Sequence, residues 1–231
     1  MKGRKIMLRE SVKYIINVLI QRGLGVLLYL IGTGWIMNFI ASVYFICYIG
    51  VALICLITMF FVNPETLKER NKKNTDSPLW DKILLGLFWL LAYFVIYLIA
   101  GCESKRITEE INLSFWIGIS LNIIASGISL WSLIVNTYLE STARIQKERG
   151  QTVCQTGPYK IIRHPTYLAI IIWCIAISFV FSTKGVIFCS VIIAIIIILR
   201  TYLEDKMLIN YLSGYNIYVS KVKYRLIPFI W

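Results

Sequence analysis

The sequence predicts an all-α integral membrane protein built as a bundle of about six transmembrane helices. Hydrophobic residues make up 58% of the 231 residues, and charged residues only 16%. The mean hydropathy is +0.71, whereas charged residues make up about a quarter of an ordinary soluble domain. Uncharged runs of roughly 20 residues, the length that crosses the hydrocarbon core as a helix, recur along the chain.

The first four helices are expected in the N-terminal part of the chain. Residues 23–64 carry no charge over 42 residues, which is enough for two helices with a break near Asn38. The basic segment before them resembles the start of a signal peptide, but the apolar stretch is too long for one and further spans follow. We therefore expect a retained first helix, whose start is the least defined. A third helix is expected over 83–101 and a fourth over 111–139.

The last two helices are expected to form a tight antiparallel hairpin. The fifth covers 165–183, and the sixth begins at Val186 and continues past Arg200, with only "STKG" between the two apolar runs. A hairpin with so short a turn places its two open ends side by side. Four polar residues then meet at one end of the bundle: His164, Arg200, Glu204 and Asp205.

The basic residues predict the orientation in the membrane. With the N-terminus in the cytoplasm, 21 of the 24 lysines and arginines lie inside, Arg22 among them, and only Lys105, Arg106 and Lys184 lie outside. This distribution favours an even number of helices, with both termini and the polar cluster cytosolic, and the plasma membrane as the location in a prokaryote. The net charge of +12 is then explained without nucleic acid, and suits anionic headgroups.

The chain divides into residues 1–135, a scaffold of four helices, and residues 136–231, which carry the unusual polar residues. The six cysteines have no metal-ligand spacing, so no metal site is predicted. Glu140, Arg144 and Glu148 repeat every four residues, which is typical of a solvated helix extending from the fourth span.

The segment "GPYKIIRHPTYL", residues 157–168, holds the only histidine in the sequence. Gly157 and Pro158 favour a turn, and Pro165 keeps His164 extended while fitting the first turn of a helix. The start of that helix offers free N–H groups to a carboxylate or phosphate. Arg163 adds a rigid fork of donors with the same preference.

The sixth helix ends in ionisable residues at membrane depth, which usually face a cavity or one another. Arg200 and Glu204 are four residues apart and could form an ion pair with each other. Alternatively, Glu204 lines a pocket for a cationic or hydroxyl-rich group. A pocket with donors for an anion and carboxylates for a cation fits a zwitterionic cytosolic cofactor.

The C-terminal part of the chain resembles the isoprenylcysteine carboxyl methyltransferase-like family, which is related to the phospholipid N-methyltransferases. The resemblance lies in "ARIQKERGQTVCQTGPYKIIRHPTYLA" and "RTYLEDKMLINYLSGYNIYVSKVKYRLIP" and covers roughly residues 143–228. The loop "NPETLKERNKK" followed by "WDK" also resembles bacterial members.

This resemblance implies a methyltransferase that uses S-adenosyl-L-methionine and takes a lipidic acceptor from the bilayer. It implies that the candidate catalytic residues are Arg163, His164, Arg200 and Glu204. The residues that it implies for cofactor binding are Gln151, Val153, Gly157, Tyr159, His164, Tyr167, Glu204 and Asp205.

Two positions depart from the family pattern. Ala169 stands where a glycine is usual, and Asp205 replaces the second acid of a Glu-Glu pair with a shorter side chain. His164 is expected to position the cofactor, with a role as a base only if the acceptor must lose a proton. Tyr215 and Tyr218 occupy the terminal Y-x-x-Y of the family and could close the pocket.

Two other classes of function compete with this interpretation. A sterol-reductase-like membrane enzyme would bind NADPH through a similar hairpin, but such enzymes need a longer chain with more spans. A non-catalytic membrane scaffold would bind no cofactor and leaves the polar cluster unexplained. The sequence does not distinguish an isoprenylcysteine-like carboxylate from a phospholipid-like amine as the acceptor.

Overall fold

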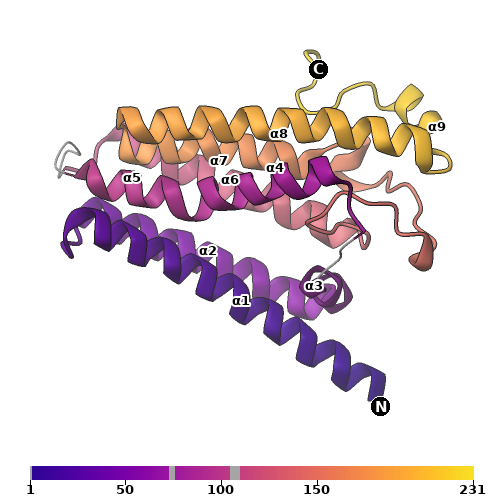
Figure 1. Ribbon diagram of the computed structural model, residues 1–231, viewed down its shortest axis with the longest axis horizontal. Coiled ribbons are helices and arrows are strands. Elements are labelled where there is room, and N and C mark those ends of the chain that lie inside the picture. The colour runs from indigo at the N-terminus through magenta and orange to yellow at the C-terminus, as the bar shows by residue number, and fades with distance from the viewer. Residues whose placement is uncertain (1, 73–75, 105–109) are drawn as a thin grey trace.

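The computed structural model describes residues 2–72, 76–104 and 110–231, with side chains from residue 6 onward. Every regular element in these ranges is helical. The long helices run roughly along one axis and form an elongated bundle (Figure 1). The predicted all-α bundle is therefore confirmed. Lys105 and Arg106 lie outside the described residues.

The first two helices are α1 (Lys2–Thr33) and α2 (Phe39–Val62), followed by the short α3 (Pro64–Asn71). The break predicted near Asn38 is confirmed, because its side chain caps α2 by accepting a hydrogen bond from the Ala41 N–H at 2.8 Å. Helix α1 begins far before residue 23, so Arg22 lies inside a candidate span, Ile6–Thr33. Its predicted place in a cytoplasmic segment is wrong, since an uncharged run marks only part of the helix.

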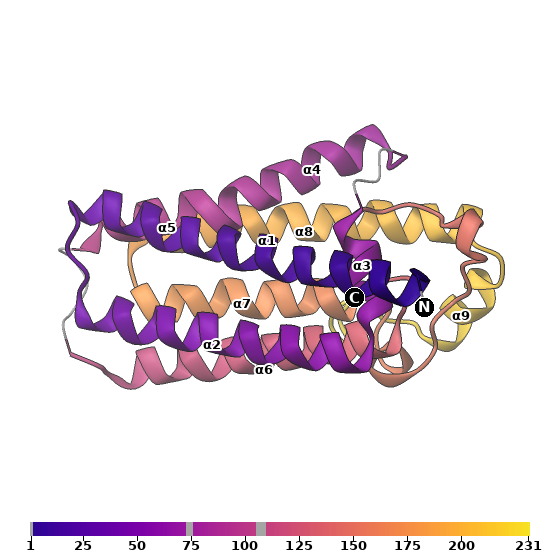
Figure 2. The ribbon, with the colours of Figure 1, turned by 90° about the horizontal axis from the view of Figure 1, so that it is seen from below.

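The third span combines α4 (Leu79–Leu90), a π-helical turn η1 (Leu91–Val95) and α5 (Ile96–Cys102). Helix α5 packs against α1 at very short range: a Cβ on Gly101 would lie 2.2 Å from the Tyr29 carbonyl oxygen. Beyond the π turn, a common site of irregularity in helices, α4 diverges from α1 (Figure 2).

The remaining helices are α6 (Leu113–Val135), α7 (Pro165–Phe181), α8 (Lys184–Tyr211) and α9 (Tyr215–Lys221). Only Ser182 and Thr183 separate α7 from α8, which confirms the predicted hairpin. Five helices are long and apolar enough to cross a membrane: α1, α2, α4–α5 together, α6 and α8. The fifth predicted span, over 165–183, corresponds to α7, a shorter apolar helix of 17 residues that packs between α6 and α8.

Residues 136–164 contain two short 3₁₀ helices, η3 (Lys147–Arg149) and η4 (Gly157–Lys160), and otherwise irregular chain. The predicted helical extension over Glu140–Glu148 is wrong, because α6 ends at Val135. Arg144 still pairs with both Glu140, at 2.9 Å, and Glu148, at 2.7 Å. The side chains of Arg144 and Glu140 are buried, so the four-residue spacing reflects packing of a loop and not a solvated helix.

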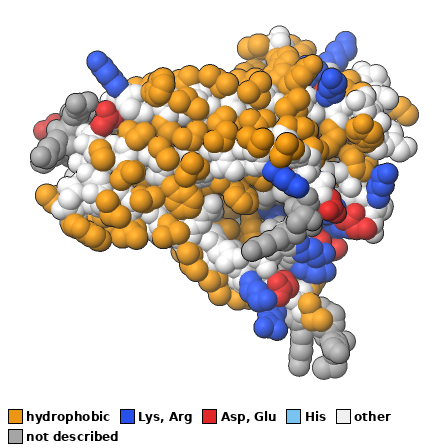
Figure 3. Space-filling view, viewed as in Figure 1, with side chains coloured by type: hydrophobic (Ala, Val, Ile, Leu, Met, Phe, Trp, Pro, Cys, Tyr) orange, Lys and Arg blue, Asp and Glu red, His pale blue; other side chains and the backbone are white. Residues whose placement is uncertain are grey.

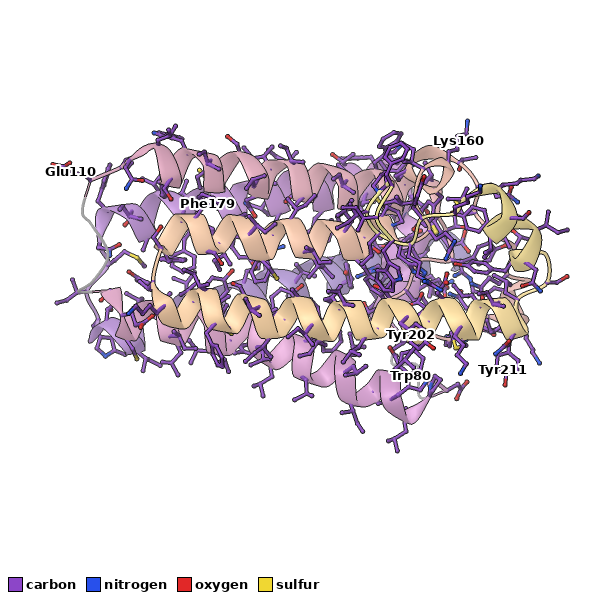
Figure 4. The ribbon with its side chains drawn as sticks, turned by 90° about the horizontal axis from the view of Figure 1, so that it is seen from above. Trp80, Glu110, Lys160, Phe179, Tyr202 and Tyr211 are labelled. Carbon is purple, nitrogen blue, oxygen red and sulfur yellow. The ribbon has the colours of Figure 1, made fainter. Side chains whose placement is uncertain are left out.

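We call one end of the bundle the loop end; it holds α3, residues 136–164 and α9. Lys160 and Tyr211 lie at this end, whereas Glu110 and Phe179 lie at the opposite one (Figure 4). Apolar side chains cover much of the long face of the molecule, and charged ones gather toward the loop end (Figure 3). This distribution is the one expected of a bundle whose middle is in lipid.

Candidate functional site

A cavity of about 1050 Å³ runs from the loop end into the bundle. Its size is at the upper end of the usual range for small-molecule pockets, roughly 300–1,000 Å³. Its wall toward the middle of the bundle is largely apolar, with Leu85, Phe88, Ala92, Ala125, Leu133, Ile170 and Trp173. Ala169, the departure from the family glycine, also lines it.

Eight of the ten predicted site residues line this cavity. They are Gln151, Val153, Tyr159, Arg163, His164, Tyr167, Arg200 and Glu204. Gly157 and Asp205 do not line it. The hairpin and the loop therefore bring most of the predicted set to one space, and the two exceptions support its wall from behind.

Asp205 is fully buried and joins four side chains from three segments. Arg163 donates Nε and Nη2 to its two carboxylate oxygens at 2.9 and 3.0 Å. Tyr215 donates its hydroxyl at 2.9 Å, Arg225 donates Nε at 2.8 Å, and His164 Nε2 lies at 3.2 Å. Such bidentate and charge-assisted bonds are the strongest class of hydrogen bond in proteins. Asp205 thus fixes the start of α7 relative to α8, α9 and the tail.

The segment of Arg163 and His164 is also held by backbone contacts with the tail. The N–H of Arg163 donates to the Tyr224 carbonyl at 3.0 Å, and that of His164 to the Arg225 carbonyl at 2.9 Å. Arg163 Nη1 donates to the carbonyls of Val222 and Lys223 at 2.8 and 2.9 Å. The guanidinium therefore makes four hydrogen bonds to protein acceptors, which hold it in one position.

Arg200 pairs with Asp81 of α4 and not with Glu204. Its Nη2 and Nε lie 2.5 and 3.2 Å from Asp81 Oδ1, and Nη2 also donates to the Ser141 carbonyl at 3.1 Å. Asp81 accepts a further bond from the Ala143 N–H at 3.0 Å. Of the two alternatives left open for Arg200 and Glu204, the mutual ion pair is absent.

Glu204 makes no ion pair with any described Lys, Arg or His. Its carboxylate accepts a short hydrogen bond from the Tyr167 hydroxyl. The Tyr167 ring is stacked on His164, with centroids 5.7 Å apart and planes at 5°, and lies 5.4 Å from the Arg200 guanidinium carbon. Glu204 is therefore a carboxylate on the cavity wall that is available to a ligand.

Tyrosines at the loop end supply neutral hydroxyls. The Tyr218 hydroxyl donates to the Tyr159 carbonyl at 2.7 Å, and the Tyr159 hydroxyl is buried and makes no hydrogen bond. Burial raises the pKa of both phenols above the usual value, so they stay protonated at neutral pH. Tyr215 and Tyr218 both line the cavity.

Gly157 shapes the loop without touching the cavity. Its φ is +57°, and a Cβ there would lie 2.9 Å from the Trp131 indole nitrogen and 3.1 Å from a Val135 methyl. Only glycine suits both the backbone angle and the close approach to α6. The turn that it makes places Tyr159 in the cavity wall.

Sequence reasoning missed several charged residues of the cavity region, Asp81 and Arg22 among them. Asp81 was quoted only as part of "WDK", although an arginine such as Arg200 at membrane depth requires a partner that could have been sought among acids at the ends of other spans. Arg22 was assigned to a cytoplasmic segment and instead lines the cavity from α1. Among the described residues, no group of three or more His, Cys, Asp or Glu could hold a metal ion.

A comparison with known families supports the motif-based interpretation. Residues 117–210 match the model of the isoprenylcysteine carboxyl methyltransferase (ICMT) family. No curated protein matches the chain. The matched region contains α7, nearly all of α6 and α8, and the loop between α6 and α7, which carry most of the cavity residues described above. Over this region the chain is similar to the isoprenylcysteine carboxyl methyltransferase family, a likeness that supports a membrane methyltransferase.

Proposed function

We propose that the protein transfers a methyl group from S-adenosyl-L-methionine to a lipophilic acceptor at the cytosolic face of the membrane. The observation that carries the proposal is the continuity of the cavity. Part of its wall is polar and bears the carboxylate of Glu204, which makes no ion pair with a described residue. Another part is apolar and includes Ile20, Leu24 and Trp89, which are exposed on the surface. A water-soluble donor and a lipid can thus approach each other in one space.

The residues present at the loop end fit this cofactor. Glu204, without an ion pair to a described residue, suits a cationic sulfonium, an amine or ribose hydroxyls, and the Tyr159 hydroxyl makes no hydrogen bond of good geometry with a described residue. Gln151, Val153 and the rings of Tyr167, Tyr215 and Tyr218 would supply the remaining walls. When bound, the cofactor supplies an activated methyl group on its sulfonium.

The protein's own residues act by positioning. Methyl transfer is a displacement that needs little covalent assistance, and holding two reactants in line can contribute about 7–11 kcal/mol. His164 is fixed between Asp205 and the Tyr167 ring, which supports a role in orienting the cofactor and not as a nucleophile. Arg163 and Arg200, both neutralised by aspartates, hold the walls in place.

Acceptor access is proposed between α1 and α4. Ile20 and Leu24 of α1 and Trp89 of α4 both line the cavity and are exposed on the surface. Helix α4 diverges from α1 beyond the π turn (Figure 2), and the exposed lining residues on both helices support an opening toward lipid on this side. An apolar acceptor can therefore enter from the bilayer without crossing water.

The proposal is tested by calorimetric titration of the detergent-purified protein with S-adenosylmethionine, S-adenosylhomocysteine and NADPH. We expect both adenosyl compounds to bind and NADPH not to bind. Glu204→Gln should weaken the binding of S-adenosylhomocysteine at least tenfold. Glu110→Gln is the matched control, because it makes the same chemical change at the opposite end of the bundle (Figure 4). Binding of NADPH alone would instead support the reductase class.

A further inference from the structure

Helix α1 carries an arginine whose charge has no partner in the described part of the protein. Arg22 lies within the candidate span Ile6–Thr33, and its Nε and Nη1 atoms are buried without any hydrogen bond. Its guanidinium carbon lies 4.0 Å from the centroid of the Tyr48 ring, a cation–π contact that leaves the N–H groups unsatisfied. A charged group at this depth is costly unless something in the cavity pairs with it.

The other arginines that line the cavity are satisfied by the protein. Arg163 and Arg200 pair with aspartates, and Arg144 pairs with glutamates. Arg70 donates to the Tyr14 hydroxyl at 2.9 Å and to the Leu139 carbonyl at 3.3 Å. Arg22 therefore differs from its neighbours in the same cavity, and a general shortage of acceptors does not explain the difference.

A second unsatisfied donor lines the cavity at a similar depth. Asn122 of α6 is buried, and its amide Nδ2 makes no hydrogen bond. The end of α1 and the start of α6 both lie at the end of the bundle opposite the loop end. Arg22 is 11 residues before the end of α1, or about 17 Å along the helix, and Asn122 is nine residues after the start of α6, or about 14 Å. Both unsatisfied groups are donors, so the ligand that completes them is rich in acceptors.

Arg22 also lies beside the opening to lipid. Its neighbours Ile20 and Leu24 on α1 are exposed and line the cavity. A molecule that enters between α1 and α4 would meet the guanidinium inside the membrane, where an anionic group is poorly solvated and a cation binds it strongly.

We propose that Arg22, assisted by Asn122, binds an anionic group, a carboxylate or a phosphate, on a lipid that occupies the cavity. The site makes Arg22 a residue that determines specificity for anionic over neutral amphiphiles. It lies outside residues 117–210, so the N-terminal helices contribute a binding group and not only a scaffold. That the bound lipid is the methyl acceptor rests on the proposed function.

The test compares three amphiphiles of equal chain length: tetradecanoate, tetradecyl phosphate and tetradecanol. Each is titrated calorimetrically into the full-length protein in a neutral maltoside detergent. For each amphiphile, the affinity of a variant is compared with that of the wild type. Partition of the amphiphile into micelles is the same in both titrations and does not affect the ratio. The two anions distinguish a carboxylate headgroup from a phosphate headgroup.

Arg22→Gln should weaken the binding of at least one anion tenfold or more and change tetradecanol less than twofold. Arg22→Lys keeps the positive charge but not the planar set of guanidinium N–H donors. Its affinity for the anion should fall less than that of Arg22→Gln. Arg9→Gln is the matched control, since Arg9 lies on the same helix, is exposed and does not line the cavity. It should leave all three affinities unchanged.

Two results overturn the proposal. In the first, Arg22→Gln binds each anion as tightly as the wild type does; in the second, Arg22→Gln weakens tetradecanol as much as it weakens the anions. Thermal unfolding in detergent shows that each variant is folded, and S-adenosylhomocysteine is titrated into the same preparations. If it binds while the anions do not depend on Arg22, this inference fails and the proposed function stands. If it does not bind while the anions depend on Arg22, the proposed function fails and the anion site stands.

Discussion

The loop end of the cavity and its middle, around Arg22, differ in whether their buried arginines have carboxylate partners. At the loop end two arginines of the wall each have a carboxylate: Arg163 has Asp205, and Arg200 has Asp81. In the middle, Arg22 has an aromatic face and no carboxylate among the described residues. Charges that hold the fold are neutralised within the chain, whereas Glu204 and Arg22 are left for ligands. Mutations that remove each kind of charge should therefore have opposite effects on stability.

The largest effect is expected for Asp205→Asn. The change leaves Arg163 buried with only carbonyl partners and weakens four side-chain contacts at once, a loss of about 3–5 kcal/mol in the free energy of unfolding. Thermal unfolding in detergent should shift by roughly 2–4 °C per kcal/mol. A transition unchanged from wild type would show that the loop end does not depend on this carboxylate.

Gly157→Ala should have a smaller effect at the same end. The new methyl meets Trp131 and Val135, and an alanine at a positive φ costs about 1–3 kcal/mol. Thermal unfolding measures the cost. Gly150→Ala is a useful comparison, because Gly150 also has a positive φ, of +60°, but no atom within 4 Å of its Cβ position. The difference in stability loss between the two variants measures the cost of the steric contact with Trp131 and Val135. Equal losses would show that this contact costs nothing.

Arg22→Gln should raise the thermal stability of the ligand-free protein, by about 1 kcal/mol. The change removes a buried charge that has no counter-ion, so the desolvation cost is lost and no ion pair is broken. Arg163→Gln sharpens the comparison, because the same substitution there breaks a pair with Asp205 and should lower stability. If both variants lose stability equally, Arg22 is a structural charge like Arg163.

The smallest effect on stability is expected for Glu204→Gln. Its carboxylate makes one side-chain hydrogen bond, to Tyr167, which the glutamine carbonyl can also accept. We expect a change within about 0.5 kcal/mol, measured by thermal unfolding beside Asp205→Asn. Two adjacent acids would thus separate a binding role from a structural one. A loss as large as that of Asp205→Asn would place Glu204 in the scaffold.

The helices were predictable because apolar runs and caps are local properties of the chain. The break at Asn38 and the α7–α8 hairpin followed from single polar residues between hydrophobic segments. The start of α1 was not predictable in the same way, because Arg22 interrupts the apolar run but points into a cavity. The spacing of charges over Glu140–Glu148 predicts a helix where the structure has a loop. A four-residue spacing occurs in both, and it does not reveal that Arg144 is buried.

The candidate site was predictable to the extent that its residues share a motif. The segments from Gln151 to Tyr167 and from Arg200 to Asp205 meet because a short hairpin joins them. The partner of Arg200 was not predictable, because Asp81 lies 119 positions away and no local pattern marks it. The division between Glu204, which faces the cavity, and Asp205, which lies behind its wall, depends on the rotation of α8.

The network around Asp205 also has a consequence for the order in which the protein folds. Arg163 leaves the ribosome 42 residues before Asp205, and Asp205 leaves it 20 residues before Arg225. The helices α1–α6 can insert and pack while Arg163 still lacks its carboxylate, as chains of this size assemble in stages. The polar end of the cavity therefore closes only when the tail has been synthesised. Until then the nascent protein is a set of packed helices whose cavity lacks its complete wall.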